Sequence, residues 1–364
     1  MKNSKDKILT LSFIGFLCTF FVINLCVKDQ DVSVSERRKL QQFPNVTLST
    51  ITDGSAKDEF EDYTVDQFAF RDFFRRIKAN INYKVFGMLD NNGVFIKDDY
   101  IFKTDYPTKT KSVLDFTKKI QSYASSFSEN NHVYYAIIPD KNYYLNTDLF
   151  LNLDYDYMYD TVTSSFDKAG YDYIELRDVL KLEDYYKTDT HWKQENLAGV
   201  VDRIGSVMNL GASSDYQAVE GGDFYGVYYG QAALNLKPDK ITYLTNEIIN
   251  DATVSYLEDT KQNQVYIPEN LTSLDSYNVY LDGPSSLITI TNPHNTSGKE
   301  LIVYRDSFGS SLTPLLIESY SKITVLDTRY ITSSIYQNYL EFTNQDVLFL
   351  YSTMTLNNSD ILKN

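Results

Sequence analysis

Leu-Ile-Val-Tyr-Arg-Asp-Ser-Phe-Gly-Ser-Ser, residues 301–311, is the stretch that decides the fold. Its apolar start, 301–304, is typical of a buried strand, and the apolar spacing over 312–320 favours a helix. A strand, a tight turn and a helix in this order place the turn at the carboxyl edge of a sheet, where α/β folds bind ligands. Ser307 in that turn is a candidate nucleophile, and the alternative is that its hydroxyl only caps the helix.

Helical and strand-like patterns alternate on both sides of this stretch. Together they predict an α/β fold with a parallel sheet covered by helices. Between them, residues from about 213 to 300 show short alternating runs rich in Tyr, Thr and Asn, which predict a mostly β insertion beside the sheet. The patterned segments are the helices 114–127 and 194–208 and the strands 133–138, 173–176, 323–326 and 347–351.

The segment Ile8–Val27 has twenty residues and no charge. At about 1.5 Å per residue, a helix of this length crosses a hydrocarbon core of about 30 Å. Lys2, Lys5 and Lys7 precede it, so the positive-inside bias predicts a cytoplasmic amino terminus. The rival is a cleaved signal peptide, but no small-x-small cleavage site follows the apolar run.

These patterns divide the chain into four parts. We expect a cytoplasmic tail (1–7), a transmembrane anchor (8–27), a juxtamembrane region of spacer, helices and hairpin (28–110), and a catalytic domain (111–364) that carries the β-rich insertion. The predicted location is the cell membrane, with a single span and the bulk of the chain on the outer side.

Composition excludes several classes of function. The 364-residue chain has a net charge of -15. This charge disfavours nucleic acid as a partner, because a protein that binds nucleic acid needs a basic face to neutralise the phosphates. Both cysteines, Cys18 and Cys26, lie in the apolar segment, so the rest of the chain has no thiol for disulfides, catalysis or metal binding. Any imidazole base must be His132, His191 or His294.

Asp189 and His191 stand just before the helical pattern that begins at residue 194. A hydroxyl nucleophile needs an imidazole to take its proton and a carboxylate to orient the imidazole, and this pair supplies both. The alternative is that Asp189 caps the helix and His191 is a surface residue. His132 opens a predicted buried strand, and the spacing of His294 does not favour a metal site.

Two of these motifs carry a resemblance to a known family. Asp189-Thr190-His191-Trp192, followed far downstream by Arg305-Asp306-Ser307-Phe308-Gly309, resembles the DHHW family of bacterial envelope proteins. That family is similar to the SGNH-hydrolase-like alginate O-acetyltransferase proteins. The likeness extends over most of the chain beyond residue 35, through Glu36-Arg37-Arg38, Phe43-Pro44, Asp66-Gln67-Phe68, Phe70-Arg71, Asn92-Gly93-Val94 and Asp327-Thr328-Arg329-Tyr330.

The resemblance implies roles for individual residues. Ser307 would be the nucleophile that accepts the acyl group, His191 its base and Asp189 the orienting acid. The serine follows the Asp/His pair, which reverses the usual SGNH order and implies a permuted sheet. Arg305, Arg329 and Trp192 are candidates for contacts with an oxyanion or a glycan, although either arginine could equally form a structural salt bridge.

The resemblance also implies a function. Such proteins move acetyl groups onto an exported polysaccharide, with a membrane-bound O-acyltransferase supplying the acetyl group, and neither a metal nor a cofactor is implied. One alternative is a carbohydrate acetylesterase of the same fold, which differs only in whether water or sugar reaches the acyl-enzyme. Another is a catalytically silent envelope protein that binds glycan or a partner.

Overall fold

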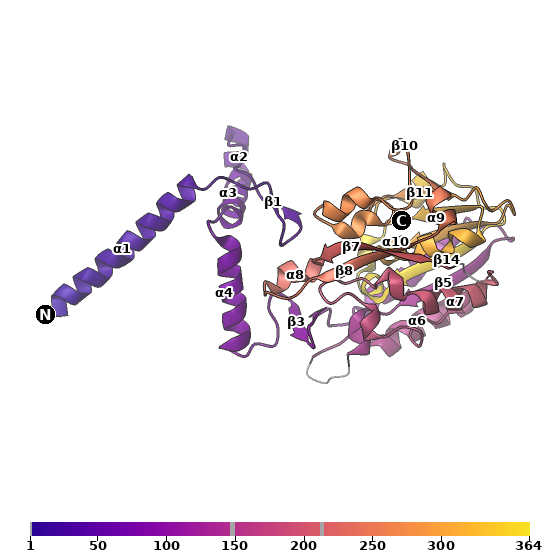
Figure 1. Ribbon diagram of the computed structural model, residues 1–364, viewed down its shortest axis with the longest axis horizontal. Helices are drawn as coiled ribbons and strands as arrows, with labels where there is room; N and C mark the ends of the chain where they lie inside the picture. Colours follow the sequence, from indigo (N-terminus) through magenta and orange to yellow (C-terminus); the bar gives the residue numbers. More distant parts are fainter. Residues whose placement is uncertain (1, 146–149, 212–214) are drawn as a thin grey trace. The chain divides into compact units, whose positions relative to one another are not determined.

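The computed structural model describes residues 2–145, 150–211 and 215–364. The chain divides into two compact units, each described by itself below (Figure 1). The first consists of residues 1–92 with 229–236, and the second of residues 93–228 with 237–364. Residues 93–110, which the sequence-based division placed with the juxtamembrane region, thus group with the second unit, and the predicted boundary at 110 stays a prediction.

A central sheet organises the second unit. Five neighbouring strands, β13, β12, β14, β5 and β6, are parallel, and β11, β9 and β10 continue the sheet in antiparallel fashion. This arrangement confirms the predicted α/β class with a mostly parallel sheet. In sheet order the strands of the described chain are β10 (Asp259–Asn263), β9 (Thr253–Tyr256), β11 (Leu287–Thr291), β13 (Lys322–Leu326), β12 (Glu300–Arg305), β14 (Asp346–Ser352), β5 (His132–Ile138) and β6 (Asp172–Ile174).

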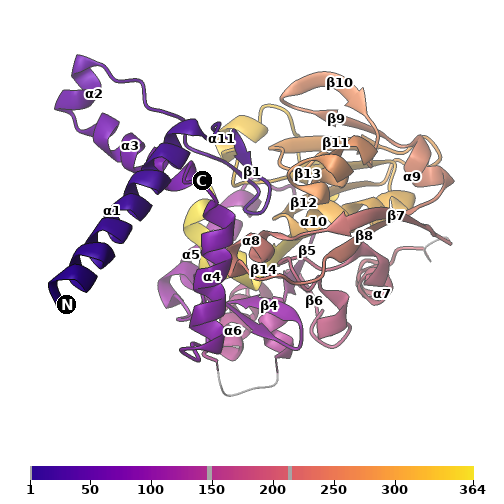
Figure 2. The same cartoon turned by 60° about the vertical axis from the view of Figure 1, so that its left-hand side comes forward.

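Helices cover both faces of this sheet (Figure 2). Alternate residues of β12 point to opposite faces, so Ile302 and Tyr304 join one core while Leu301 and Val303 join the other. The first core is completed by α5 (Thr110–Ala124), α6 (Tyr155–Asp167) and α12 (Thr353–Asn357). The second is completed by α7 (Ala198–Met208), α10 (Phe308–Leu312) and the 3-10 helix η6 (Thr313–Ser319).

The helix predicted over 312–320 differs from the observed one. The α-helix α10 ends at Leu312, and the chain continues as the 3-10 helix η6 with Pro314 in its first turn. Proline has no N–H to donate to the carbonyl four residues earlier, so an α-helix is not favoured through this position. The apolar spacing still buries Leu315 and Leu316, and the prediction of a buried face was therefore correct.

The region predicted as a β-rich insertion, about 213–300, contains five strands among its described residues. Residues 213 and 214 lie outside the part of the chain that the structure describes. The hairpin of β7 (Gln217–Phe224) and β8 (Asp239–Thr245) forms a separate two-stranded sheet. Strands β9, β10 and β11, by contrast, extend the central sheet itself rather than lying beside it. The short helices α8 (Val227–Ala232) and α9 (Glu247–Asp251) connect these strands.

The carboxyl ends of the parallel strands bring polar residues to one edge of the sheet. Asp327 follows β13, Asp306 and Ser307 follow β12, Ser352 ends β14, and Lys141 lies just beyond the end of β5. Because β13, β12, β14 and β5 are neighbours in this order, these residues come from adjacent positions along the edge. This is the edge at which α/β folds place their sites.

A small hairpin supports the loop that carries Asp189. Strands β3 (Val94–Lys97) and β4 (Tyr100–Lys103) are joined by Asp98 and Asp99, which both have positive φ, 50° and 65°. Two such residues in succession are typical of the tight turn that suits the twist of a hairpin. The amide of Ile101 in β4 donates to the carbonyl of Lys187, 2.8 Å away.

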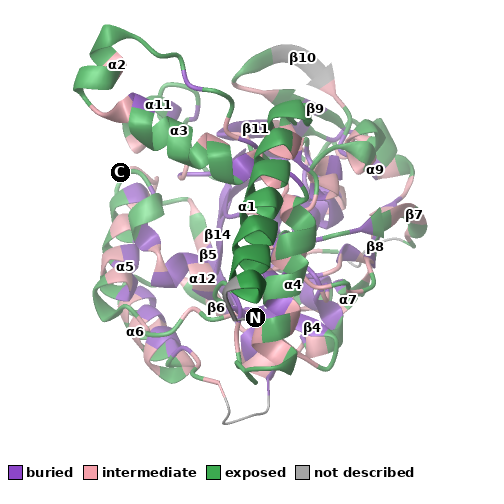
Figure 3. Ribbon diagram, turned by 90° about the vertical axis from the view of Figure 1, so that its left-hand side faces the viewer, coloured by how far each residue is buried: buried purple, intermediate pink, exposed green. Residues whose placement is uncertain are grey.

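The first unit contains α1 (Lys2–Cys26), α2 (Leu48–Thr52), α3 (Ser55–Asp66), α4 (Arg71–Lys84) and the short pair β1 (Val32–Ser33) and β2 (Arg38–Lys39). Helix α1 is exposed from Ser4 to Thr19, and Phe20, Ile23 and Asn24 near its end are half-buried (Figure 3). In the described part of the chain, residues Ser4–Cys26 of this helix are by length and composition sufficient to cross a membrane.

Ion pairs join the charged segment after α1 to the region before α4. The carboxylate of Asp66 accepts from both terminal nitrogens of Arg38, at 2.7 and 2.5 Å. Arg71 donates to Glu36 at 2.5 Å, and the Gln67 side chain donates to the carbonyl of Gln41. The motif Glu36-Arg37-Arg38 therefore contacts both Asp66-Gln67-Phe68 and Phe70-Arg71.

Candidate active site

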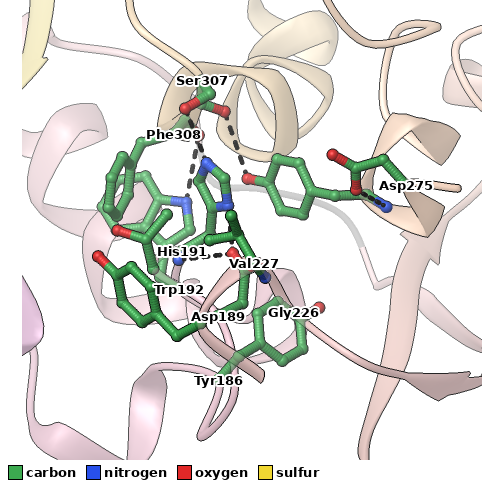
Figure 4. Close-up of polar contacts among 12 residues, drawn as sticks. Tyr186, Asp189, His191, Trp192, Gly226, Val227, Asp275, Ser307 and Phe308 are labelled. Carbon is green, nitrogen blue, oxygen red and sulfur yellow. Dashed lines mark hydrogen bonds and ion pairs between the residues drawn. The ribbon is translucent and has the colours of Figure 1, made fainter. Parts of the chain in front are cut away.

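Ser307 lies in the turn between β12 and α10, with φ -62° and ψ -22°. Ser307 occupies the N-cap position of α10, but its hydroxyl makes no capping bond, so the alternative that the hydroxyl only caps the helix is wrong. The Oγ atom lies instead 2.7 Å from Nε2 of His191, which comes from a loop 116 positions earlier in the chain (Figure 4).

The other ring nitrogen of His191 faces Asp189. Nδ1 donates to a carboxylate oxygen of Asp189 at 2.6 Å, and this bond favours the tautomer in which Nε2 is free to accept the Ser307 proton. Asp189 is 1% exposed and His191 is 12% exposed, so solvent reaches the imidazole but hardly the carboxylate. Hydrogen bonds thus link the three side chains in the geometry of a serine triad.

Backbone donors hold the Asp189 carboxylate in place. One oxygen also accepts from the amide of His191 at 3.1 Å, and the other accepts from the amide of Val227 at 2.8 Å. Gly226 lies so close that an added Cβ would stand 2.3 Å from Cβ of Asp189. Only glycine fits at this position without moving the acid.

The loop that carries the pair is irregular, which allows residues two apart to share a hydrogen bond. Tyr185 and Trp192 form an isolated antiparallel bridge, and the amide of Tyr186 donates to the carbonyl of His191. Asp239 of β8 accepts from the amides of Lys187 and Thr188 at 2.9 and 2.8 Å. The β7–β8 hairpin therefore fixes the loop from one side.

Lys141 fixes the same loop from the other side. Its buried ammonium group donates to the carbonyls of Tyr186, Lys187 and Asp189 at 3.0, 3.2 and 2.7 Å. The rings of Phe102 and Tyr228 lie around it, and burial lowers the pKa of Lys141 to about 7, against the opposing attraction of Asp189. Three loop carbonyls thus depend on one side chain that approaches from the end of β5.

Two aromatic rings enclose the imidazole. The Tyr277 ring stacks on His191 at 3.9 Å with an interplanar angle of 11°, and the Phe308 ring lies 4.9 Å away. The Tyr277 hydroxyl donates to Oγ of Ser311 and to the carbonyl of Ser307. This stacking restricts rotation of the imidazole and ties the ring to the Ser307 turn.

Asp306 shapes the turn itself. One carboxylate oxygen accepts from the amide of Phe308, and the other accepts from the amide and hydroxyl of Ser352. The Thr355 hydroxyl donates to this second oxygen as well. The turn after β12 is therefore bonded to the end of β14. Asp306 is buried and its bonds go to Phe308 and to the residues at the end of β14, so we assign it to orienting Ser307.

Of the three candidates for substrate contact, two are buried. Arg305 is 1% exposed and pairs with Asp327, whose carboxylate also binds Arg329. Trp192 is buried and donates from Nε1 to Oγ of Ser311 and to the carbonyl of Phe308. Neither Arg305 nor Trp192 reaches solvent and both contact the turn, whereas Arg329 is partly exposed. A substrate contact stays a prediction for each of the three.

The remaining histidines lie elsewhere. His132 is exposed at the start of β5, and His294 pairs with Asp251 at 2.8 Å. Among the residues that the structure describes, no three His, Cys, Asp or Glu side chains are grouped as a metal site would require.

Sequence reasoning missed several residues of this site. Lys141 offered a signal, since a charged residue directly after a buried strand often marks the active edge of an α/β sheet. Gly226, Asp239 and Tyr277 offered none, because their positions depend on how the β-rich region folds back onto the loop.

We predict that Gly226→Ala displaces the acid. The added methyl group meets Asp189, so we expect a loss of about 1–3 kcal/mol of stability and a fall of more than about tenfold in acylation of Ser307. Gly205→Ala in α7 is the control, because its Cβ would meet only Leu210 at 3.9 Å and alanine favours a helix. Equal behaviour of the two variants, measured by thermal unfolding and acylation rate, contradicts the assignment.

The buried Lys141 also predicts a pH dependence of stability. Its pKa of about 7 in the folded protein lies below the unfolded value of about 10.4, so the unfolded chain binds more protons between these values. Stability should therefore rise as pH increases from about 7 towards 10, and Lys141→Met should lack this component. The test is the difference in unfolding free energy between the two proteins at pH 7 and pH 9, and an unchanged difference refutes the prediction.

Comparison with known proteins gives no match to a protein-family profile and none to a curated protein sequence. Solved structures do match. A DHHW family protein from Eubacterium siraeum has 17% identity and a TM-score of 0.59, covering 76% of this chain and 97% of that one. Bacillus cereus PatB1 with a sulfonyl adduct has 20% identity and a TM-score of 0.57, covering 74% and 98%. The resemblance to DHHW family proteins that the motifs indicated is thus confirmed at the level of the fold.

Proposed function

We propose that the protein is a membrane-anchored O-acetyltransferase that modifies a cell-surface polysaccharide through an acyl-enzyme on Ser307. The proposal rests on two hydrogen bonds that link the three side chains. Oγ of Ser307 lies 2.7 Å from Nε2 of His191, and Nδ1 of His191 lies 2.6 Å from the Asp189 carboxylate. These hydrogen bonds activate a serine hydroxyl near neutral pH, and a serine with only a structural role does not require them.

In the first step, Oγ of Ser307 attacks the carbonyl carbon of an acetyl donor. The hydroxyl proton passes to Nε2 of His191, and Asp189 stabilises the resulting imidazolium through Nδ1. The bond from carbon to the leaving group breaks, and the leaving group takes the proton from Nε2. The product is an acetyl ester on Ser307 with a neutral imidazole.

In the second step, a sugar hydroxyl attacks the acetyl ester. Its proton passes to Nε2 of His191, the new ester bond forms, and Ser307 Oγ regains a proton as it leaves. Water in place of the sugar would give acetate, so the acetylesterase alternative uses the same residues. What differs is only the nucleophile that reaches the acyl-enzyme.

The proposed setting is the outer face of the cell membrane. Helix α1 supplies the single span, and the lysines before its apolar core favour a cytoplasmic amino terminus. Activated acetyl donors are made in the cytoplasm, so an outward-facing enzyme needs a carrier across the bilayer. We propose a membrane-bound O-acyltransferase as that partner and an exported polysaccharide as the acceptor.

We predict that an activated acetyl ester acetylates the full-length protein in detergent or nanodiscs. Peptide mass spectrometry should find the acetyl group on Ser307 and no acetyl group on the Ser307→Ala variant. His191→Ala and Asp189→Asn should acetylate more slowly by about 10³-fold or more, since each breaks the hydrogen-bonded sequence. A sulfonyl fluoride should modify the same serine and block acetylation.

Two comparisons separate the alternatives. Addition of an oligosaccharide acceptor should transfer the acetyl group to sugar for a transferase, whereas release of free acetate alone indicates an esterase. A wild-type protein as inert as Ser307→Ala towards both reagents contradicts the enzymatic proposal and favours the silent binding protein.

A further inference from the structure

Helix α4 of the first unit has an apolar face that remains largely exposed. Phe73 is 60% exposed and Ile77 is 39% exposed, and Phe74 and Ile81 lie on the same side at helical spacing. Phe70, just before the helix, continues the stripe. We call Phe70, Phe73, Phe74, Ile77 and Ile81 the α4 apolar face.

The opposite side of α4 is already occupied within the first unit. Arg75 donates to the carbonyl of Gly230 at 2.6 Å and pairs with Glu36, while Ala79 is completely buried. The helix is therefore fixed by its polar side, and the apolar side chains stay exposed. A contiguous exposed apolar patch of this kind marks an interaction surface, because leaving it in water is unfavourable.

Contacts with α1 indicate that this surface faces the membrane. The Phe20 ring of α1 stacks on Phe68 at 6.3 Å and lies 5.9 Å from Phe74. The Asn24 side chain of α1 accepts from the amide of Ala69 at 2.9 Å. The start of the α4 apolar face is thus continuous with the outer end of the proposed membrane span.

The depth of these contacts is set by helix geometry. Phe20 precedes the end of α1 at Cys26 by six residues, which is about 9 Å along a helix. If α1 crosses the bilayer, Phe68 and Phe74 must then lie below the level at which the chain leaves the hydrocarbon. Amphipathic helices that lie in a membrane surface bury their apolar face by about 5–10 Å, so the two depths agree.

The charge of α4 also fits a lipid surface. Five basic residues and one acidic residue give the helix a charge of +4, 5 - 1, in a chain whose net charge is -15. Arg71 and Arg75 are paired with Glu36, so Arg76, Lys78 and Lys84 are the basic residues left to meet a lipid surface. A basic amphipathic helix next to a membrane is attracted to anionic headgroups. A second protein surface would satisfy the apolar face but would not explain its continuity with α1.

We propose that the α4 apolar face is a second membrane contact, which inserts into the outer leaflet beside α1 and holds the first unit on the lipid surface. The inference rests on α1 as the membrane span, which is part of the proposed function. It adds a lipid-binding surface that is independent of the chemistry at Ser307.

The test places a nitroxide label at single cysteines of the full-length protein in nanodiscs of phosphatidylcholine and phosphatidylglycerol. One variant carries Phe73→Cys with Cys18→Ser and Cys26→Ser. A matched control carries Leu114→Cys in the same background, since Leu114 is a 45% exposed apolar residue of α5 in the second unit. A third retains the native Cys18 alone and reports on α1. Each labelled protein must keep the thermal unfolding transition of the wild type.

Power saturation measures how often each label collides with oxygen, which concentrates in lipid, and with a water-soluble nickel chelate. The label at position 73 should collide mainly with oxygen, as a lipid-exposed site does, and the label at 114 mainly with the chelate. A label at 73 that meets the chelate, or that meets neither reagent because protein covers it, overturns the inference while Cys18 remains in lipid. A Cys18 label in water contradicts the membrane span as well.

Discussion

Burial of the Asp189 carboxylate is the constraint on which the site depends. An ionised carboxylate removed from water is strongly destabilising unless donors replace the lost hydration. Here the donors are Nδ1 and the amide of His191 and the amide of Val227. Val227 begins helix α8, which lies between strands β7 and β8. The Asp189 carboxylate can therefore be buried only when this region has folded back onto the loop.

The same principle extends along the edge of the sheet. Asp306 is buried but bonded to Ser352 and Thr355, and Asp327 is buried but paired with Arg305 and Arg329. The bonds of Asp306 join the end of β12 to the end of β14, and the pair of Arg305 with Asp327 joins β12 to the segment after β13, so these polar groups fix the turn that carries the nucleophile. A hydroxyl held in this way needs little reorganisation when it reacts, which is how a preorganised site lowers a barrier.

The sequence was sufficient for the features that have local signals. The parallel sheet follows from the alternation of helical and strand-like segments. Ser307, His191 and Asp189 could be named because their two motifs stand at strand-to-helix connections and resemble motifs of one family. The pairing of β9–β11 with the central sheet could not be inferred, since an antiparallel strand has the same alternation whether it joins one sheet or another. The stacking of Tyr277 on His191 likewise depends on packing between distant segments.

Strand register connects the core to the chemistry. In the parallel pair β12–β14, Tyr304 lies opposite Phe349 and Arg305 opposite Leu350. Shifting β12 by one residue would exchange its two faces and move Leu301 and Val303 out of the core that they fill. It would also carry Asp306 away from Ser352 and Ser307 away from the imidazole. The register of a single strand, buried on both faces, therefore sets the distance between the hydroxyl and its base, 116 positions apart in the chain.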